Sequence, residues 1–231
     1  MDADWQKVRK RYYVALTEVL RQFDRSIFDE SEMAHVLERL TEPRLRSSSH
    51  WFISGISGSG KTTVTRILQE QGFHGLPNVT TRAKRSNEQE TDYVFTDEET
   101  FAKWEQNGLL FHSHTTNGVS HAIRYEDLQR LSTNEKLYAD KSVTSLSVLY
   151  KEVPALHVAT LIYLLPPSFD ELCIRIEARE KSDVRALSRQ EILTRFSEEI
   201  EEMHKSIELP YAYIVNDSKE RVTNKVKSFT A

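Results

Sequence analysis

Apolar residues recur with two different periods along this chain, and the period changes near residue 47. Before that point they lie three or four positions apart, which is typical of amphipathic helices that bury one face. The spacing predicts a long helix over residues 4–23, a shorter helix over 31–40 and a polar linker over 41–50. We therefore expect an N-terminal helical extension, residues 1–47, that either packs on the main domain or docks a protein partner.

Residues 48–231 form the expected main domain, in which short apolar runs alternate with helical patterns. The runs predict strands at 51–54, 92–95, 109–114, 136–140, 157–165 and 211–216. The helical spacing predicts helices at 62–70, 97–108, 125–133, 142–152, 169–180, 189–208 and from Lys219 onward. Such alternation indicates an α/β fold with a mainly parallel sheet covered on both faces. Ligands of these folds bind at the carboxyl ends of the strands.

The segment "ISGISGSGKTT", residues 53–63, holds three of the seven glycines of the chain. Its spacing matches the phosphate-loop pattern G-x-x-x-x-G-K-[ST], in which backbone N–H groups and the lysine bind phosphates and the hydroxyl ligates Mg²⁺. The loop joins a predicted strand to a helix N-terminus, which favours an anion. A glycine-rich surface turn is the alternative that this context disfavours. The residues expected to contact a nucleoside triphosphate are Gly55, Ser57, Gly58, Ser59, Gly60, Lys61, Thr62 and Thr63.

Composition limits the setting and the partners. The net charge of −4 gives no long-range attraction to nucleic acid, so none is expected as a partner. The single cysteine, Cys173, excludes an internal disulfide, and we expect it to be a core residue. No apolar run at the N-terminus suggests a signal peptide or a membrane anchor. We therefore expect a cytoplasmic protein without a membrane partner.

Arginines distinguish this chain from other phosphate-loop proteins. The GTPase segments D-x-x-G and N-K-x-D are absent, and in "YVFTDE", residues 93–98, Thr96 interrupts the apolar run that an ATPase motif needs. We expect Asp97 to cap a helix instead. The arginines form two groups, which suits a reaction between two phosphate-bearing substrates. They are Arg82 and Arg85 in "TTRAKR", and Arg175, Arg179 and Arg195 on two helices.

From Trp51 to Phe229 these motifs follow one another as they do in the guanylate kinase family, which the chain resembles. The shared order is G-x-S-G-S-G-K-T-T, T-T-R-x-x-R, D-Y-x-F, P-P-S with R-x-x-x-R, and "YIVND". The resemblance implies a P-loop three-layer fold and ATP-dependent phosphoryl transfer to a nucleoside monophosphate, with Mg²⁺ as cofactor. GMP is the acceptor that it favours.

The resemblance also implies roles for single residues. Lys61 and the loop amides hold the ATP phosphates, Thr62 ligates Mg²⁺, and Asn216 contacts the adenine. The lid arginines that close over the transferred group correspond to Arg175, Arg179 and Arg195. The residues that grip the acceptor phosphate correspond to Arg82, Arg85 and Tyr93.

The acceptor site departs from the family pattern. Asn78 replaces a serine, and the strand around Phe111 lacks the carboxylate that reads guanine. Ser120 and His121 stand where tyrosines are expected. Asp140 aligns with an aspartate that either reads the base or supports Mg²⁺ through water. "HTTNGVS", residues 114–120, is similar to ribose 1,5-bisphosphate phosphokinases, so a phosphosugar acceptor stays open, as does a non-catalytic binding module.

Two weaker signals have ordinary interpretations. His112 and His114 lie on one face of the strand predicted over 109–114, with His121 nearby. The three are more simply polar residues near a cleft than metal ligands, and His114 is a candidate for contact with the acceptor. The charge run "EEIEEMHK", residues 198–205, is most simply a solvated helix face.

Overall fold

The protein is analysed as a computed structural model that describes residues 2–23, 29–84, 93–116, 118–180 and 188–230. Its α-helices are α1 (Ala3–Arg21), α2 (Met33–Thr41), α3 (Lys61–Glu70), α4 (Glu98–Gln106), α5 (Tyr125–Gln129), α6 (Val143–Glu152), α7 (Phe169–Glu180), α8 (Arg189–Lys205) and α9 (Lys219–Thr230). Its strands are β1 (His50–Gly55), β2 (His74–Gly75), β3 (Asn78–Thr80), β4 (Tyr93–Phe95), β5 (Leu110–Thr116), β6 (Val119–Arg124), β7 (Leu137–Asp140), β8 (Thr160–Leu165) and β9 (Ala212–Val215). Among the described helices, none is long and apolar enough to cross a membrane.

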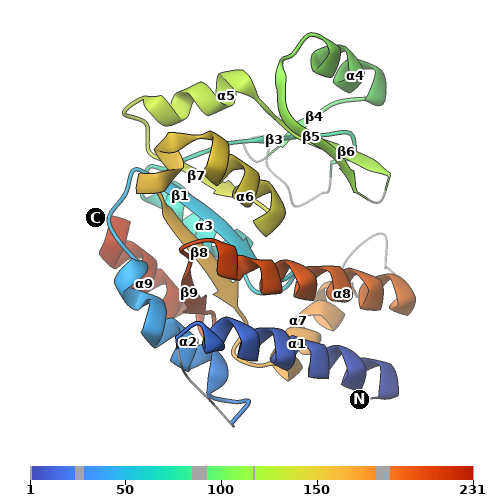
Figure 1. Ribbon diagram of the computed structural model, residues 1–231, viewed down its shortest axis with the longest axis vertical. Helices are drawn as coiled ribbons and strands as arrows, with labels where there is room; N and C mark the ends of the chain where they lie inside the picture. The colour runs from blue at the N-terminus through green and yellow to red at the C-terminus, as the bar shows by residue number, and fades with distance from the viewer. Residues whose placement is uncertain (1, 24–28, 85–92, 117, 181–187, 231) are drawn as a thin grey trace.

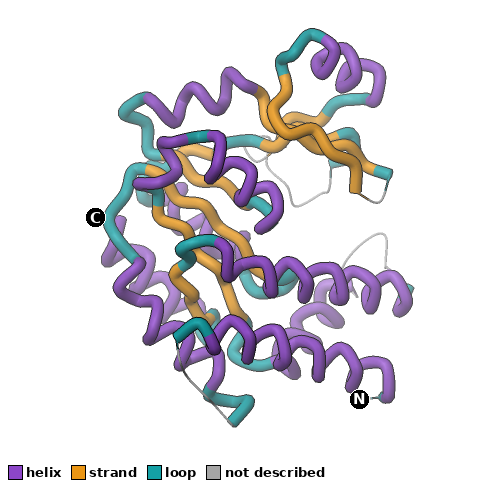
Figure 2. The backbone as a smooth tube through the Cα atoms, in the orientation of Figure 1, coloured by secondary structure: helices purple, strands orange, loops and turns teal. Residues whose placement is uncertain are grey.

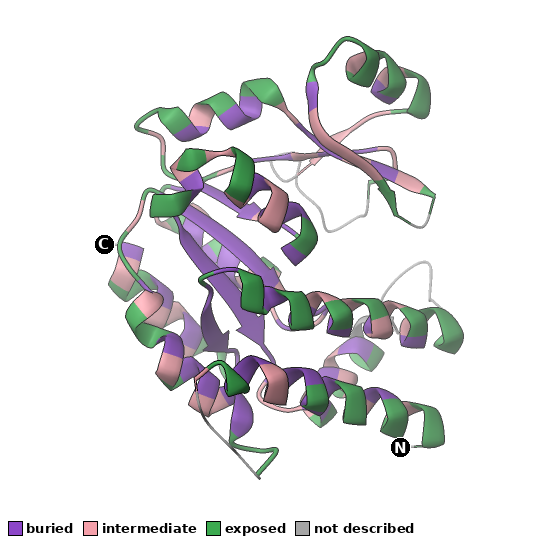
Figure 3. Cartoon of the chain, viewed as in Figure 1, coloured by how far each residue is buried: buried purple, intermediate pink, exposed green. Residues whose placement is uncertain are grey.

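A parallel sheet in the order β2-β7-β1-β8-β9 forms the centre of the molecule (Figures 1 and 2). Its central strands are buried on both faces, as Figure 3 shows, which explains their almost continuous apolar sequence. On β1, Trp51 and Ile53 pack with α3 and α9, while Phe52 points to the opposite face. The result is the three-layer α/β architecture that the alternation of strands and helices predicts.

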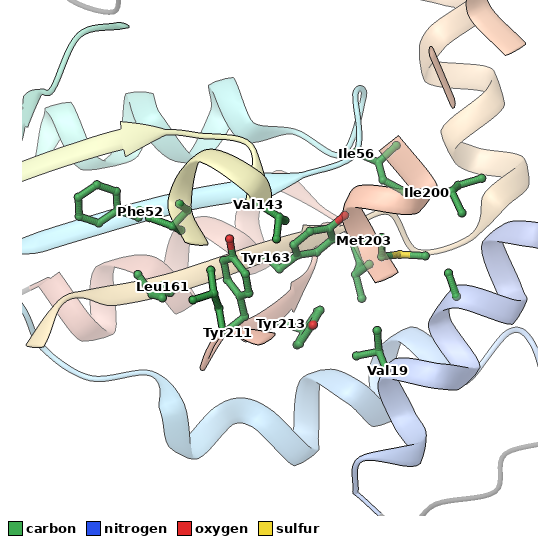
Figure 4. Close-up of a cluster of buried hydrophobic side chains, with 14 of the residues drawn as sticks. Val19, Phe52, Ile56, Val143, Leu161, Tyr163, Ile200, Met203, Tyr211 and Tyr213 are labelled. Carbon is green, nitrogen blue, oxygen red and sulfur yellow. The ribbon is translucent and has the colours of Figure 1, made fainter. Parts of the chain in front are cut away.

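The face of the sheet that Phe52 joins carries the larger core. Figure 4 shows the tyrosines of β8 and of the β9 segment, Tyr163, Tyr211 and Tyr213, gathered there with Met203 of α8. Val19 of α1 belongs to the same buried cluster. The N-terminal helices therefore complete the hydrophobic core of the main domain.

Helix α1 lies along α8, as Figure 1 shows. Near its N-terminus the Trp5 ring packs edge-on against two aromatic rings, with centroids 6.0 Å from Phe169 and 5.4 Å from Phe196. Farther along, Arg11 Nη2 lies 2.7 Å from Glu201 Oε1. Helix α1 thus contacts the start of α7 and much of α8, the helices that carry the predicted lid arginines.

Helix α2 covers β9, the edge strand of the parallel sheet. Thr41 Oγ1 accepts the N–H of Tyr213 at 2.9 Å, so a side chain takes the place of a neighbouring strand. The carboxylate of Glu38 is only 2% exposed and pairs with Arg221 and Lys225 of α9. Apolar packing, a capped strand edge and a buried ion cluster all fix α2 on the main domain.

A second, four-stranded sheet in the order β4-β3-β6-β5 was not expected. Its pairs β3–β6 and β5–β6 are antiparallel, so the expectation of a mainly parallel sheet holds only for the central one. Strand β6 was missed because polar residues occupy half of it, and β3 because it has only three residues. A bulge between Phe111 and His114 gives His112 a φ of 53°, which breaks the regular face expected for this segment.

Candidate active site

The phosphate loop, residues 55–62, leads from the carboxyl end of β1 into the N-terminus of α3. Gly60 precedes α3 with a φ of 102°, a conformation that side chains disfavour. A Cβ on Gly60 would also lie 1.9 Å from Asn216 Nδ2. Asn216 Nδ2 instead donates to Ser59 O at 2.7 Å, so the loop and the segment after β9 are held together. The contact requires glycine at position 60 on both steric and conformational grounds.

The loop has the donors and the free polar capacity that a triphosphate requires. Lys61 Nζ spans the loop and donates to Gly55 O at 2.7 Å. The Ser59 hydroxyl is fully buried, and it has no hydrogen-bond partner within the described part of the chain. A buried hydroxyl without a partner is costly, and a phosphate oxygen at the loop would satisfy it. Thr62 is exposed on the first turn of α3. These residues fit a bound nucleoside triphosphate and its Mg²⁺.

Of the three predicted lid arginines, Arg195 bonds this loop directly, and Arg175 bonds Asn216, whose side chain bonds the loop. Arg175 of α7 donates through Nη2 to Asn216 O at 2.9 Å, and its Nε bonds Glu171 at 2.9 Å. Arg195 of α8 donates through Nη2 to Ser57 Oγ at 2.8 Å. Arg179 lies one turn beyond Arg175 on α7, but its side chain is outside the described part of the structure.

Glu199 also contacts the loop, which the sequence did not predict. Its Oε2 accepts the backbone N–H of Ser57 at 2.7 Å, and its Oε1 accepts Arg195 Nε at 3.1 Å. Glu202 bonds the Thr144 N–H at 2.9 Å. The interpretation of residues 198–205 as a solvated face is therefore wrong for these two carboxylates.

The predicted acceptor residues lie mainly on the second sheet. The guanidinium carbon of Arg82 lies 4.6 Å from the ring centroid of Tyr93, and Asn78 stands opposite Tyr93 in the strand register. Arg85 lies outside the described residues. An arginine fixed against an aromatic face presents its remaining N–H groups in a defined direction.

Ser120 and His114 lie on the antiparallel strands β6 and β5. The Ser120 N–H donates to Thr81 Oγ1 at 2.9 Å, and its hydroxyl donates to Glu98 Oε2 at 3.1 Å. Glu98 belongs to the first turn of α4, where Asp97 caps the helix through the Thr100 N–H at 2.7 Å, as expected. The carboxylate that reads guanine was expected on the strand around Phe111, which is β5. Glu98 was not predicted, because nothing in the sequence spacing pairs α4 with β6.

The His114 ring stacks on His121, with centroids 5.6 Å apart. Burial lowers the pKa of His121 to about 4, with additional contributions from His114, Arg82 and Lys141. His121 is therefore neutral at physiological pH and accepts or donates a hydrogen bond without charge. Within the described residues, no group of three histidine, cysteine, aspartate or glutamate side chains is arranged to hold a metal ion.

A buried lysine at the end of β7 bonds Asn78, one of the predicted acceptor residues. Lys141 Nζ donates to Asn78 Oδ1, and Asn78 Nδ2 donates to Asp140 O at 3.2 Å. Lys141 is 4% exposed, and burial lowers its pKa to about 7, against the opposing effect of Asp140 and Asp127. Asp140 pairs with Ile53 in the register, so it ends β7 beside the start of the phosphate loop. The only sequence signal for Lys141 was a charge directly after an apolar strand.

Comparisons of the sequence with known proteins identify one family, and a solved structure shares the fold. The family model described as guanylate kinase matches residues 48–231. A guanylate kinase of Clostridium acetobutylicum is 27% identical over 179 residues, which cover 76% of this chain and 81% of the relative. One of Oleidesulfovibrio alaskensis is 29% identical over 189 residues, covering 80% and 87%. The crystal structure of guanylate kinase from Anaplasma phagocytophilum superposes with a TM-score of 0.58 at 20% identity, covering 80% of this chain and 86% of that one.

Proposed function

The chain belongs to the guanylate kinase family, and we propose that it transfers the γ-phosphoryl group of ATP to GMP. The observation that carries the proposal is the position of two arginines, one bonded to the phosphate loop and one to the residue after β9 that bonds this loop. Arg195 donates to the Ser57 hydroxyl, and Arg175 donates to Asn216, whose side chain bonds the loop. Phosphoryl transfer is catalysed mainly by positioning and by neutralising charge on the transferred oxygens, which guanidinium groups at this loop provide.

On the donor side, Lys61 and the loop N–H groups bind the β- and γ-phosphates, and Lys61 exchanges its bond to Gly55 O for phosphate oxygens. Thr62 would hold Mg²⁺, with Asp140 as support through water, and the ion would supply positive charge to the phosphates. Asn216 contacts the adenine, and Arg179 joins Arg175 and Arg195 over the transferred group. No covalent intermediate is needed, because the acceptor phosphate attacks directly.

On the acceptor side, Arg82, Arg85 and Tyr93 bind the phosphate of GMP. Asn78, Ser120 and His114 lie close to the base. The carboxylate of Glu98, already bonded to Ser120, supplies an acceptor for guanine N–H groups, which the strand around Phe111 does not. A hydrogen-bond acceptor in this position favours guanine, because a guanine N–H left without a hydrogen bond in a closed site costs about 1–3 kcal/mol.

Two other functions are less well supported. A phosphosugar kinase rests only on the segment 114–120, whereas the matching relatives named above are guanylate kinases. A non-catalytic binding module has no use for Lys61 and two arginines at the phosphate loop. We also propose that residues 1–47 act as part of the catalytic domain, since α1 and α2 share its hydrophobic core.

The proposal is tested by ADP formation from Mg-ATP with GMP, dGMP, AMP, CMP, UMP, dTMP and ribose 1,5-bisphosphate in turn. We expect rapid turnover with GMP and little with the others. Lys61→Ala should abolish turnover, and the matched control Lys103→Ala should not, because Lys103 is an exposed residue of α4 that pairs only with Glu99 among the described residues. ADP formation with ribose 1,5-bisphosphate alone would overturn the proposal. So would the absence of ADP formation with every acceptor tested.

A further inference from the structure

A carboxylate from α8 occupies a donor of the phosphate loop. Glu199 is 23% exposed, and its two oxygens bond different partners: the backbone N–H of Ser57 at 2.7 Å and Arg195 Nε at 3.1 Å. Arg195 in turn donates to the Ser57 hydroxyl at 2.8 Å. The three residues form a closed ring of hydrogen bonds that ties α8 to the loop.

This ring places a negative charge where the loop is built to receive one. The N–H of Ser57 lies within the G-x-x-x-x-G span, whose amides serve phosphate oxygens. One N–H cannot serve a carboxylate and a phosphate together at full strength, and two anions at the same donor repel each other. A triphosphate that uses the Ser57 N–H therefore has to displace the Glu199 carboxylate.

We propose that Glu199 is a positioning residue that holds Arg195 on the phosphate loop and competes with the triphosphate for the Ser57 N–H. This inference rests on the proposed function, because it takes the loop as the site of ATP. When the triphosphate takes the Ser57 N–H, the carboxylate withdraws, and the guanidinium of Arg195 loses its partner beside the incoming phosphates. Binding of nucleotide is thereby coupled to release of Arg195 for the transferred phosphoryl group.

The proposal predicts the sign of a binding effect. The variant Glu199→Gln keeps the size of the side chain and removes its charge. We expect the full-length variant to bind inorganic tripolyphosphate with Mg²⁺ about tenfold more tightly than the wild type. The reason is that a neutral amide competes less strongly than the Glu199 carboxylate for the Ser57 N–H. A merely structural role for Glu199 would change the affinity in the opposite direction, because the loop would be less well ordered.

Isothermal titration calorimetry measures this affinity. The titrations are done at 0.15 M salt, because distant charges are screened there and only charges close to the bound tripolyphosphate affect its binding. The matched control is Glu198→Gln, which removes the same charge from an exposed neighbour on α8 and should leave the affinity unchanged within about twofold. Glu199→Ala is the second variant and should also bind more tightly. In kinetics with GMP, Glu199→Gln should lower the KM for ATP and leave kcat within about twofold, because the wild type has already released Arg195 from Glu199 when the triphosphate is bound.

Equal or weaker tripolyphosphate binding by both Glu199 variants, or binding by none of the proteins, would overturn the proposal. Tighter binding by the Glu198 control to the same extent would also overturn it, because the effect would then be one of net charge. The binding assay needs no acceptor. Failure of the proposed function would instead appear as absent ADP formation with GMP, so the two failures are distinguishable.

Discussion

Trp5 offers the most direct test of whether the N-terminal extension serves the active site. Its ring packs edge-on against Phe169 at the start of α7 and against Phe196 of α8, the residue next to Arg195. Replacing Trp5 by alanine removes both ring contacts and leaves a cavity at the base of the two lid helices. We expect a loss of stability together with a loss of control over Arg195.

The magnitude follows from these contacts. Each aromatic pair contributes about 0.5–1.5 kcal/mol beyond the area it buries. Truncation of a fully buried tryptophan costs about 3–5 kcal/mol, and Trp5 is only partly buried. We therefore expect Trp5→Ala to lower the free energy of unfolding by about 2–3 kcal/mol. Trp5→Phe keeps a ring at the contact and should recover most of this loss.

Urea denaturation measures the stability, and steady-state kinetics at a temperature where the variant is folded measure the function. We expect kcat to fall severalfold, since a displacement of Arg195 by a fraction of an ångström weakens its contact with the transferred group. Val14→Ala is the matched control, because Val14 is 50% exposed on the same helix and its loss should change stability by no more than about 0.5 kcal/mol. Unchanged stability would refute the packing argument. A destabilised variant with unchanged kcat would refute the link to Arg195.

Two further predictions concern buried charges. Burial lowers the pKa of Lys141 to about 7 from 10.5, so between these values the unfolded chain binds a proton that the folded chain has lost. The unfolding free energy of the wild type should therefore rise with pH relative to Lys141→Met, by up to about 1.4 kcal/mol per pH unit, in urea titrations at pH 7, 8 and 9; a constant difference would contradict the assignment. Glu38→Ala should cost about 1–3 kcal/mol in the same assay, because it removes the buried carboxylate that Arg221 and Lys225 share and leaves them only Asp217 and Glu42 among the described carboxylates; a loss below about 0.5 kcal/mol would contradict it.

The phosphate loop and the central sheet were predictable because their signals are local. Fixed spacing identified Gly60 and Lys61, and apolar runs long enough to be buried on both faces identified strands such as β8. The second sheet was not predictable in this way. Strand β6 mixes polar and apolar residues, and its buried positions do not alternate regularly, so its pattern does not differ from that of a loop.

Contacts between segments that are far apart in the sequence were also not predicted. Glu199 lies 142 positions from Ser57, and helical periodicity assigns it only to a face of α8, without indicating what that face meets. Glu98 and Lys141 were missed for the same reason, since each acquires its role from a strand far away in the sequence. Charges that the sequence alone assigns to solvent are thus the positions at which tertiary contacts most change the interpretation.

Helix α8 is attached both to α1 and to the phosphate loop, and these two attachments differ in kind. Toward α1 it is fixed by aromatic packing through Phe196 and by the Arg11–Glu201 pair. Toward the phosphate loop the described hydrogen bonds come from Glu199 and Arg195, and phosphate oxygens can replace these bonds. Only the attachment to the phosphate loop competes with a ligand. Binding of a triphosphate can therefore rearrange Glu199 and Arg195 while the face of α8 that packs on α1 stays in place. The N-terminal extension then holds the backbone of α8 in place, so the movement of Arg195 is limited to the reach of its own side chain.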